Sequence, residues 1–108
     1  MKLVTAIIQD RDIRQVTDSL IGQGFQVTQN QTMGAFLQEK NATLFTAVDD
    51  DQVETVISII EENSKTRTQI ATPIIDIALV NTFETGATEI EIGGATIFVQ
   101  NIEQFKKI

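Results

Sequence analysis

The sequence lacks the side chains that most often perform acid–base or covalent catalysis. Its 108 residues include no cysteine, no histidine and no tyrosine. The missing cysteines exclude disulfides, thiolate metal sites and cysteine nucleophiles, and the missing histidines remove the commonest general base. Neither a P-loop nor a dinucleotide-binding glycine pattern is present. We therefore expect a protein that is not an enzyme and that holds no cofactor or metal.

Basic residues are scarce as well. Eight lysines and arginines face fifteen acidic residues, which gives a net charge of −7. Duplex nucleic acid and anionic membranes are poor partners for such a chain, because each contact with a phosphate needs a cation. A small anionic nucleotide is less strongly disfavoured, because backbone N–H groups and a few side chains can hold its phosphates.

Long apolar runs are absent. None approaches the roughly 18 residues that would span a bilayer, and the first residues have no signal-peptide pattern. We expect a cytoplasmic protein. With 42% hydrophobic residues, the chain predicts one globular domain over residues 1–108, small enough that oligomerisation would help to bury its surface.

The first half of the chain alternates between strand and helix patterns. Residues 3–8 form an apolar run of strand length. Ile13, Val16 and Leu20 recur at helical spacing and predict a helix over about residues 12–22, capped by Asp10 or Asp12 and ended by Gly24. The alternation of residues 25–28 then indicates a half-buried strand.

A hairpin and a second helix follow. Apolar pairs at residues 36–37 and 44–45 flank a turn near Lys40-Asn41. Asp49-Asp50-Asp51 is expected to cap a helix with an apolar stripe from Val53 to Ile60. These three carboxylates could also attract a hard cation, but their spacing does not match that of an EF-hand, and capping is the favoured interpretation.

The C-terminal third contains the only proline. Pro73 cannot lie in a central strand, yet the residues after it are unusually apolar for a loop, so residues 66–88 predict either a long loop with some strand or a strand excursion. Glu89 to Ile92 alternate, Gly93-Gly94 predicts a turn, and residues 96–99 predict a strand that runs back as a C-terminal hairpin.

The order of these elements is β-α-β-β-α-β with an additional hairpin. It predicts an α+β fold, a ferredoxin-like sandwich in which two helices cover one face of a mainly antiparallel sheet. The isoleucines and valines on both faces of the strands indicate that a partner covers the other face.

Several segments together resemble the PII-like cyclic di-AMP receptor family, nitrogen-regulatory-PII-like signal-transduction proteins. They are Met1 to Asp10, Gly34-Ala35-Phe36-Leu37, Asn41-Ala42-Thr43 and Glu89 to Val99. The resemblance extends over nearly the whole chain. It implies a homotrimer that binds the cyclic dinucleotide in clefts between subunits and signals to a target protein through the loop at residues 66–88.

Carried over position by position, the resemblance also implies a ligand site. Its residues are Gln26, Thr28, Gly34, Ala35, Phe36, Leu37, Asn41, Ala47, Gly94 and Phe98. Thr28 could donate its hydroxyl to a phosphate, and Asn41 could read an adenine through paired donor and acceptor groups. The backbone at residues 35–37 could supply amides, and Phe36 could pack on a purine.

Each of these residues also has an ordinary structural explanation. Phe36, Leu37 and Phe98 suit the core of any sheet, and Gly34 and Asn41 suit turns. Three positions depart from the family pattern: Gln26 replaces an arginine, and Ala35 and Ala47 replace glycines. The residues after Pro73 depart from it too. Three hypotheses follow: a receptor for cyclic di-AMP or a related nucleotide, an interaction module that binds its partner without ligand, and, least favoured, an enzyme acting on bound nucleotide.

The Gln26 departure gives a direct test. We expect Gln26→Arg to tighten the binding of cyclic di-AMP by about one to two decades, because a charge-assisted contact with phosphate contributes about 1.5–3 kcal/mol. The gain should be larger at low salt. Titration calorimetry at two ionic strengths measures both effects, and an unchanged affinity would show that residue 26 does not face the phosphate.

Overall fold

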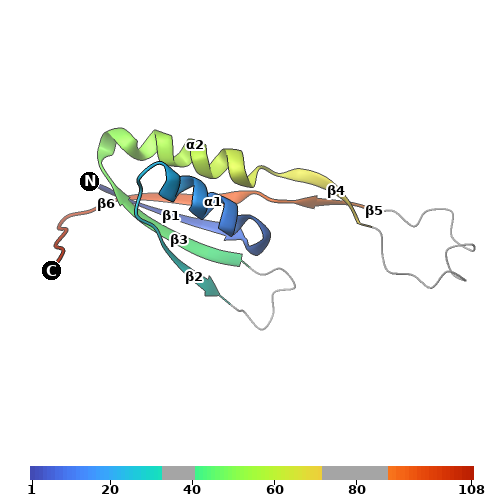
Figure 1. Ribbon diagram of the computed structural model, residues 1–108, viewed down its shortest axis with the longest axis horizontal. Helices are drawn as coiled ribbons and strands as arrows, with labels where there is room; N and C mark the ends of the chain where they lie inside the picture. The colour runs from blue at the N-terminus through green and yellow to red at the C-terminus, as the bar shows by residue number, and fades with distance from the viewer. Residues whose placement is uncertain (33–40, 72–87) are drawn as a thin grey trace, which may run out of the picture.

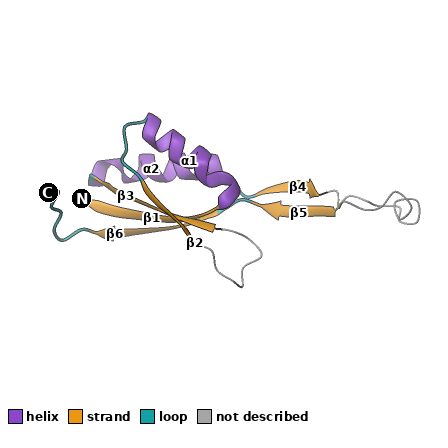
Figure 2. Cartoon of the chain, turned by 60° about the horizontal axis from the view of Figure 1, so that its bottom comes forward, coloured by secondary structure: helices purple, strands orange, loops and turns teal. Residues whose placement is uncertain are grey.

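The computed structural model describes residues 1–32, 41–71 and 88–108 (Figure 1). Their elements are β1 (Lys2–Gln9), α1 (Asp10–Gly22), β2 (Thr28–Thr32), β3 (Asn41–Val48), a 3-10 turn η1 (Asp50–Gln52), α2 (Val53–Ser64), β4 (Arg67–Ala71), β5 (Thr88–Ile92) and β6 (Ala95–Asn101). Both helices lie on one face of a four-stranded sheet, and β4 and β5 project from its end as a narrow two-stranded arm (Figure 2).

The large sheet has the strand order β2-β3-β1-β6, with all neighbours antiparallel. This order is that of a ferredoxin-like sheet in which β6 takes the place of the fourth strand. The α+β class and the ferredoxin-like plan predicted from the sequence are confirmed. The run of apolar residues in β1 suits its inner position, where both edges are paired and the helices cover one face.

The predicted C-terminal hairpin is wrong. β5 pairs with β4, and β6 pairs with β1, so Gly93 and Gly94 carry the chain from the arm into the large sheet without turning it back. Both glycines have positive φ, +86° and +91°, which explains why the sequence resembles a turn. Long-range pairing prevails because it places Ile97 opposite Ala6, on the side of the helices.

α1 begins at Asp10, and no side chain caps it with a hydrogen bond. The cap expected from Asp10 or Asp12 is therefore wrong. Asp12 lies in the first turn, where its carboxylate binds an arginine of the arm. The end of α1 follows the prediction: Gly24 has a φ of +91°, and the Phe25 amide donates to the Leu20 carbonyl at 3.1 Å.

Two other predicted details differ from the structure. Residues 25–27 lie outside any strand, because β2 starts at Thr28. Asp49 makes no side-chain capping bond, and Asp50 forms an ion pair with the N-terminal amino group at 2.9 Å. That contact lowers the pKa of Asp50. The segment at residues 66–88 contains strand, as both of its predicted alternatives allow: β4 lies within it and β5 begins at its last residue, and its middle, with Pro73, lies outside the described residues.

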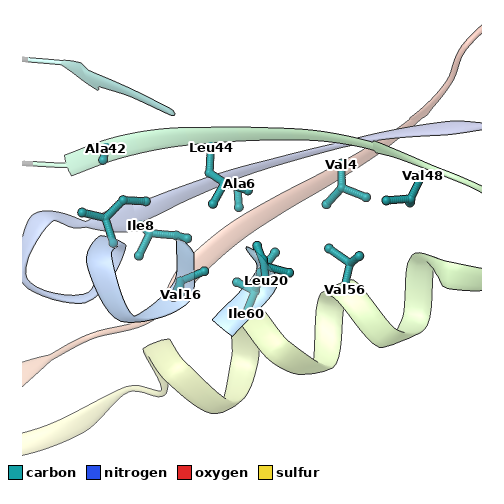
Figure 3. Close-up of a cluster of buried hydrophobic side chains, with 11 residues drawn as sticks. Val4, Ala6, Ile8, Val16, Leu20, Ala42, Leu44, Val48, Val56 and Ile60 are labelled. Carbon is teal, nitrogen blue, oxygen red and sulfur yellow. The ribbon is translucent and has the colours of Figure 1, made fainter. Parts of the chain in front are cut away.

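The core lies between the helices and the sheet (Figure 3). It contains Val4, Ala6, Ile8, Ile13, Val16, Leu20, Ala42, Leu44, Val48, Val56 and Ile60, each at most 4% exposed. The helical spacing predicted for Ile13, Val16 and Leu20 is thus confirmed. No helix in the described parts of the chain has the length and apolar character needed to cross a membrane. In the same ranges, no three acidic side chains cluster closely enough to hold a metal ion.

The arm is fixed to the body by Arg67, the first residue of β4. Its Nη2 and Nη1 atoms donate to the two carboxylate oxygens of Asp12 at 2.7 and 3.2 Å. Nη1 also donates to the Lys65 carbonyl at 3.1 Å. The bond with Asp12 raises the pKa of the guanidinium, and the two parallel N–H···O bonds make this contact bidentate. A second contact, from Arg11 to Gln69 at 2.9 Å, joins α1 to the same strand.

We expect Arg67→Met to lower the free energy of unfolding by about 1–3 kcal/mol, because it leaves the Asp12 carboxylate buried without its charged partner. The cost stays below that of a fully buried pair, because the Arg67 side chain is 44% exposed.

Urea unfolding at one protein concentration measures this change. Arg14→Met is the matched control, since Arg14 is 93% exposed and lies 4.0 Å from Asp18, and it should change stability by less than about 0.5 kcal/mol. Equal losses for the two variants would show that the Asp12 contact does not stabilise the fold.

Candidate functional site

The face of the large sheet that points away from the helices carries most of the sequence-predicted residues that the structure describes. Directly opposed residues share a face, so the register places Thr28, Phe45, Thr5 and Phe98 in one row across all four strands. Phe98 is 51% exposed. Ala47 lies on the same face, opposite Leu3, and is exposed. We call this surface the open face.

Thr28 and Phe98 lie at opposite ends of that row. Thr28 is on the edge strand β2 and Phe98 on the edge strand β6, three strand spacings apart. At about 4.8 Å for each spacing, the two residues are separated by roughly 14 Å. Within one chain, therefore, they do not converge on one point.

Asn41 and Gly94 are brought together. They line a shallow hollow of about 320 Å³ where the open face meets the arm, and its other lining residues are Ile7, Gln9, Gly93, Ala95 and Thr96. Asn41 is the first residue of β3, opposite Gln9 of β1. The turn predicted for Asn41 is wrong. Asn41 is already a strand residue, because it pairs with Gln9 of β1 and Thr32 of β2.

The floor of the hollow is a point of close backbone approach. A Cβ atom on Gly93 would collide with the Lys65 carbonyl oxygen and lie 2.8 Å from Arg67 Nη1. The Gly93 amide donates to Gln9 Oε1 at 2.8 Å, and the Gly94 amide donates to the Ser64 carbonyl. The junction between arm and sheet is therefore held by hydrogen bonds from both sides.

Gln26 lies apart from the hollow. It precedes β2, its side chain is exposed, and its carbonyl accepts a hydrogen bond from the buried hydroxyl of Thr46 at 2.7 Å. This bond fixes the backbone as it enters the edge strand. The predicted residues Gly34, Ala35, Phe36 and Leu37 lie outside the described residues.

Sequence reasoning missed Ile7, Gln9 and Thr96. The period of two along residues 3–9 places Ile7 and Gln9 on the face opposite Ala6 and Ile8, so alternation could have separated them from the core. Their position beside Asn41 and Gly94 depends on strand pairing across distant parts of the chain, which the alternation does not encode.

The chemistry of the hollow suits binding. Its lining offers two side-chain amides, a hydroxyl, the backbone of two glycines and an apolar wall from Ile7. Among the residues that the structure describes, none of the lining side chains is ionisable, so none of them could act as a general acid or base near neutral pH. Amides and hydroxyls can read the edges of a nucleobase or bind phosphate oxygens. In a chain of charge −7, a hollow whose described lining is uncharged repels an anion less than a lining of carboxylates would.

A family model described as the cyclic-di-AMP receptor matches residues 1–108. The chain belongs to the cyclic-di-AMP receptor family. The resemblance predicted from the sequence is thus confirmed over the full length. A receptor family implies a binding or signalling protein rather than an enzyme.

The chain is also similar to a solved structure, the crystal structure of a functionally unknown protein from Pediococcus pentosaceus ATCC 25745. The two are 33% identical, with a TM-score of 0.80, and the match covers 99% of this chain and 96% of that one. This similarity supports the fold of the receptor family over almost the whole chain.

The backbone of this receptor-family chain tolerates no side chain at the junction. We expect Gly93→Ala to destabilise the protein by about 2 kcal/mol or more, because it adds a clash with backbone to an unfavourable positive φ. Urea unfolding measures the loss. Gly22→Ala is the control: nothing lies within 4 Å of its added methyl, and it should be neutral or slightly stabilising. A neutral Gly93→Ala would contradict the close approach described above.

Proposed function

We propose that the protein is a cytoplasmic homotrimer that binds cyclic di-AMP in clefts between subunits and signals to a target protein through the segment at residues 66–88. The observation that carries this proposal is the position of Thr28 and Phe98, on one face but at opposite edges of the sheet. Residues of one ligand site at opposite edges can meet only where the β2 edge of one subunit approaches the β6 edge of the next.

Such a contact is heterologous, because it joins two different surfaces of the same chain. Heterologous contacts form a closed ring when the rotation between subunits closes. The family resemblance implies three subunits. The open face supports this arrangement, since Leu3, Ile7, Phe45 and Phe98 give it an apolar surface that an assembly would remove from water.

In the proposed complex, the hollow takes one part of the dinucleotide. Asn41 reads an adenine edge, the Gly94 backbone allows the ligand to approach closely, and Ile7 packs against the base. Thr28 of the same subunit and the β6 edge of the neighbouring subunit would contact the rest of the dinucleotide. The exposed Gln26 would lie beside the edge strand where the family pattern has an arginine, so the phosphates would lack one charge-assisted contact.

A second function is favoured by the same departures. Gln26 supplies no charge, and the exposed methyl group of Ala47 lies on the open face where the family pattern has glycine. An interaction module of the same fold that binds its target without ligand would tolerate both. The two functions differ in one property, the binding of nucleotide.

Isothermal titration calorimetry with cyclic di-AMP tests the proposal, with cyclic di-GMP and ATP as comparison ligands. We expect a saturable signal near one ligand per subunit that is specific for the adenine dinucleotide. No heat at high ligand concentration would favour the ligand-independent module.

We further expect Asn41→Ala to weaken the binding of cyclic di-AMP by at least about fivefold, since a hydrogen bond to a base contributes about 1 kcal/mol. Light scattering should show an unchanged oligomer. Asn63→Ala is the matched control: Asn63 lies on α2, where its side chain donates to the Ile59 carbonyl at 2.7 Å, and its loss should not alter the affinity. Equal affinities for Asn41→Ala and the unmodified protein would remove Asn41 from the site.

A further inference from the structure

The arm has two strands and therefore two outer edges. β4 and β5 pair with each other, and in the parts of the chain that the structure describes neither of them pairs with a third strand. α1 reaches the arm through Arg67 and Gln69 of β4, which ties that strand to the body. β5 lies on the side of the arm away from the helices (Figure 2). The backbone groups along its outer edge can therefore pair with a strand of another molecule.

The side chains of β5 determine what kind of strand can pair there. Glu89 and Glu91 lie two residues apart, so they share one face of the arm, and both are exposed. The residues directly opposite them on β4, Ile70 and Thr68, carry no charge. Ile90 lies on the other face and is 39% exposed. The edge thus presents two carboxylates on one face and an apolar side chain on the other.

These carboxylates disfavour a second copy of β5 as the partner strand. Antiparallel self-pairing about Ile90 would place Glu89 of one copy opposite Glu91 of the other, and directly opposed like charges are destabilising. The neighbouring sequence supplies no cation, because between Arg67 and Lys106 the chain has five acidic residues and neither lysine nor arginine. A strand with cations at alternate positions would instead place each cation about 5 Å from a carboxylate. The charges therefore favour a basic strand from another protein.

We propose that the outer edge of β5 (Thr88–Ile92) docks an extended, basic segment of a target protein, with lysine or arginine at two alternate positions and an apolar residue between them. The two cations face Glu89 and Glu91, and the apolar residue packs beside Ile90. This inference rests on the proposed function, in which the arm belongs to the signalling segment, and adds the chemistry of the partner. A two-stranded ribbon is marginally stable alone, so the added strand also stabilises the arm.

A short peptide tests this docking edge in the full chain. The peptide Thr-Lys-Val-Lys-Val has the pattern of β5 with the charges reversed, and Thr-Lys-Lys-Val-Val is the scrambled control, whose lysines point to opposite faces of a strand. NMR follows the amides of Thr88–Ile92 as each peptide is added at low ionic strength. We expect the patterned peptide to bind with a Kd on the order of millimolar and to slow amide exchange in β5 about threefold or more, because strand pairing protects N–H groups. The scrambled peptide should not slow it.

A charge swap identifies the side chains that meet the peptide. In the double variant Glu89→Lys with Glu91→Lys, the lysine peptide should bind about fivefold or more weakly, because two attractive pairs become repulsive. The peptide Thr-Glu-Val-Glu-Val should bind to this variant in its place. Glu61→Lys with Glu62→Lys is the matched control, since both residues are exposed on α2 and the change in net charge is equal. It should keep the affinity for the lysine peptide within about twofold.

Two results would overturn the proposal. If the patterned peptide leaves amide exchange in β5 unchanged, both without ligand and with cyclic di-AMP, the glutamates only protect the edge from self-pairing. If the scrambled peptide acts equally, or if the α2 control loses as much affinity as the β5 variant, the attraction is one of net charge and no strand is added. Absence of heat with cyclic di-AMP would count against the ligand in the proposed function and not against the docking edge, which is measured in the ligand-free chain.

Discussion

The buried carboxylate of Asp12 determines where the arm can be attached. It is 4% exposed, so its charge needs a partner, and Arg67 supplies one through two hydrogen bonds. That pair fixes the start of β4 against the first turn of α1. Gly93, which faces Arg67 across the junction, must then be a glycine, and the chain must pass from β5 into β6 of the large sheet at the end where Gln9 and Asn41 lie. The site and the arm share one end of the molecule for this reason.

The two faces of the large sheet have different roles. Helices α1 and α2 cover one face and bury its aliphatic side chains, which leaves the other face with a mixed surface of aromatic, aliphatic and hydroxyl groups. An uncovered apolar face is costly for a small monomer and useful for an assembly. Because the two edge strands carry residues of one predicted site, the face that would join subunits and the face that would hold ligand are the same surface. Assembly and binding are then linked in the proposed trimer: ligand stabilises the trimer, and the trimer completes the site.

The elements with strong local periodicity could be predicted from the sequence. The spacing of Ile13, Val16 and Leu20 gave α1 within two residues, and the order of elements gave the ferredoxin-like plan. The errors arose where a distant residue decides the local structure. Gly93-Gly94 is typical of a hairpin turn, which would pair β5 with β6, but β5 pairs with β4 instead. Asp12 is a residue type typical of helix caps, but its carboxylate binds Arg67, 55 residues later. Strand register likewise placed Ile7, Gln9 and Thr96 beside Asn41, and no short stretch of sequence contains that information.

The charge of the ligand sets the remaining constraint on the site. In the proposed complex, a cyclic dinucleotide would bring two phosphates to a subunit of charge −7, and the described lining of the hollow offers side-chain amides and one hydroxyl. A hydrogen bond from a neutral donor to an anion is about half as strong as one from an arginine. The affinity that neutral donors provide also depends less on the salt concentration. Affinity in such a site must come from packing of the bases and from donors held in place before the ligand arrives. Asn41, whose backbone is fixed in the β1–β3 ladder, would be a donor of that kind. In the proposed complex, the rigidity of the sheet at Asn41 is therefore a condition for tight binding.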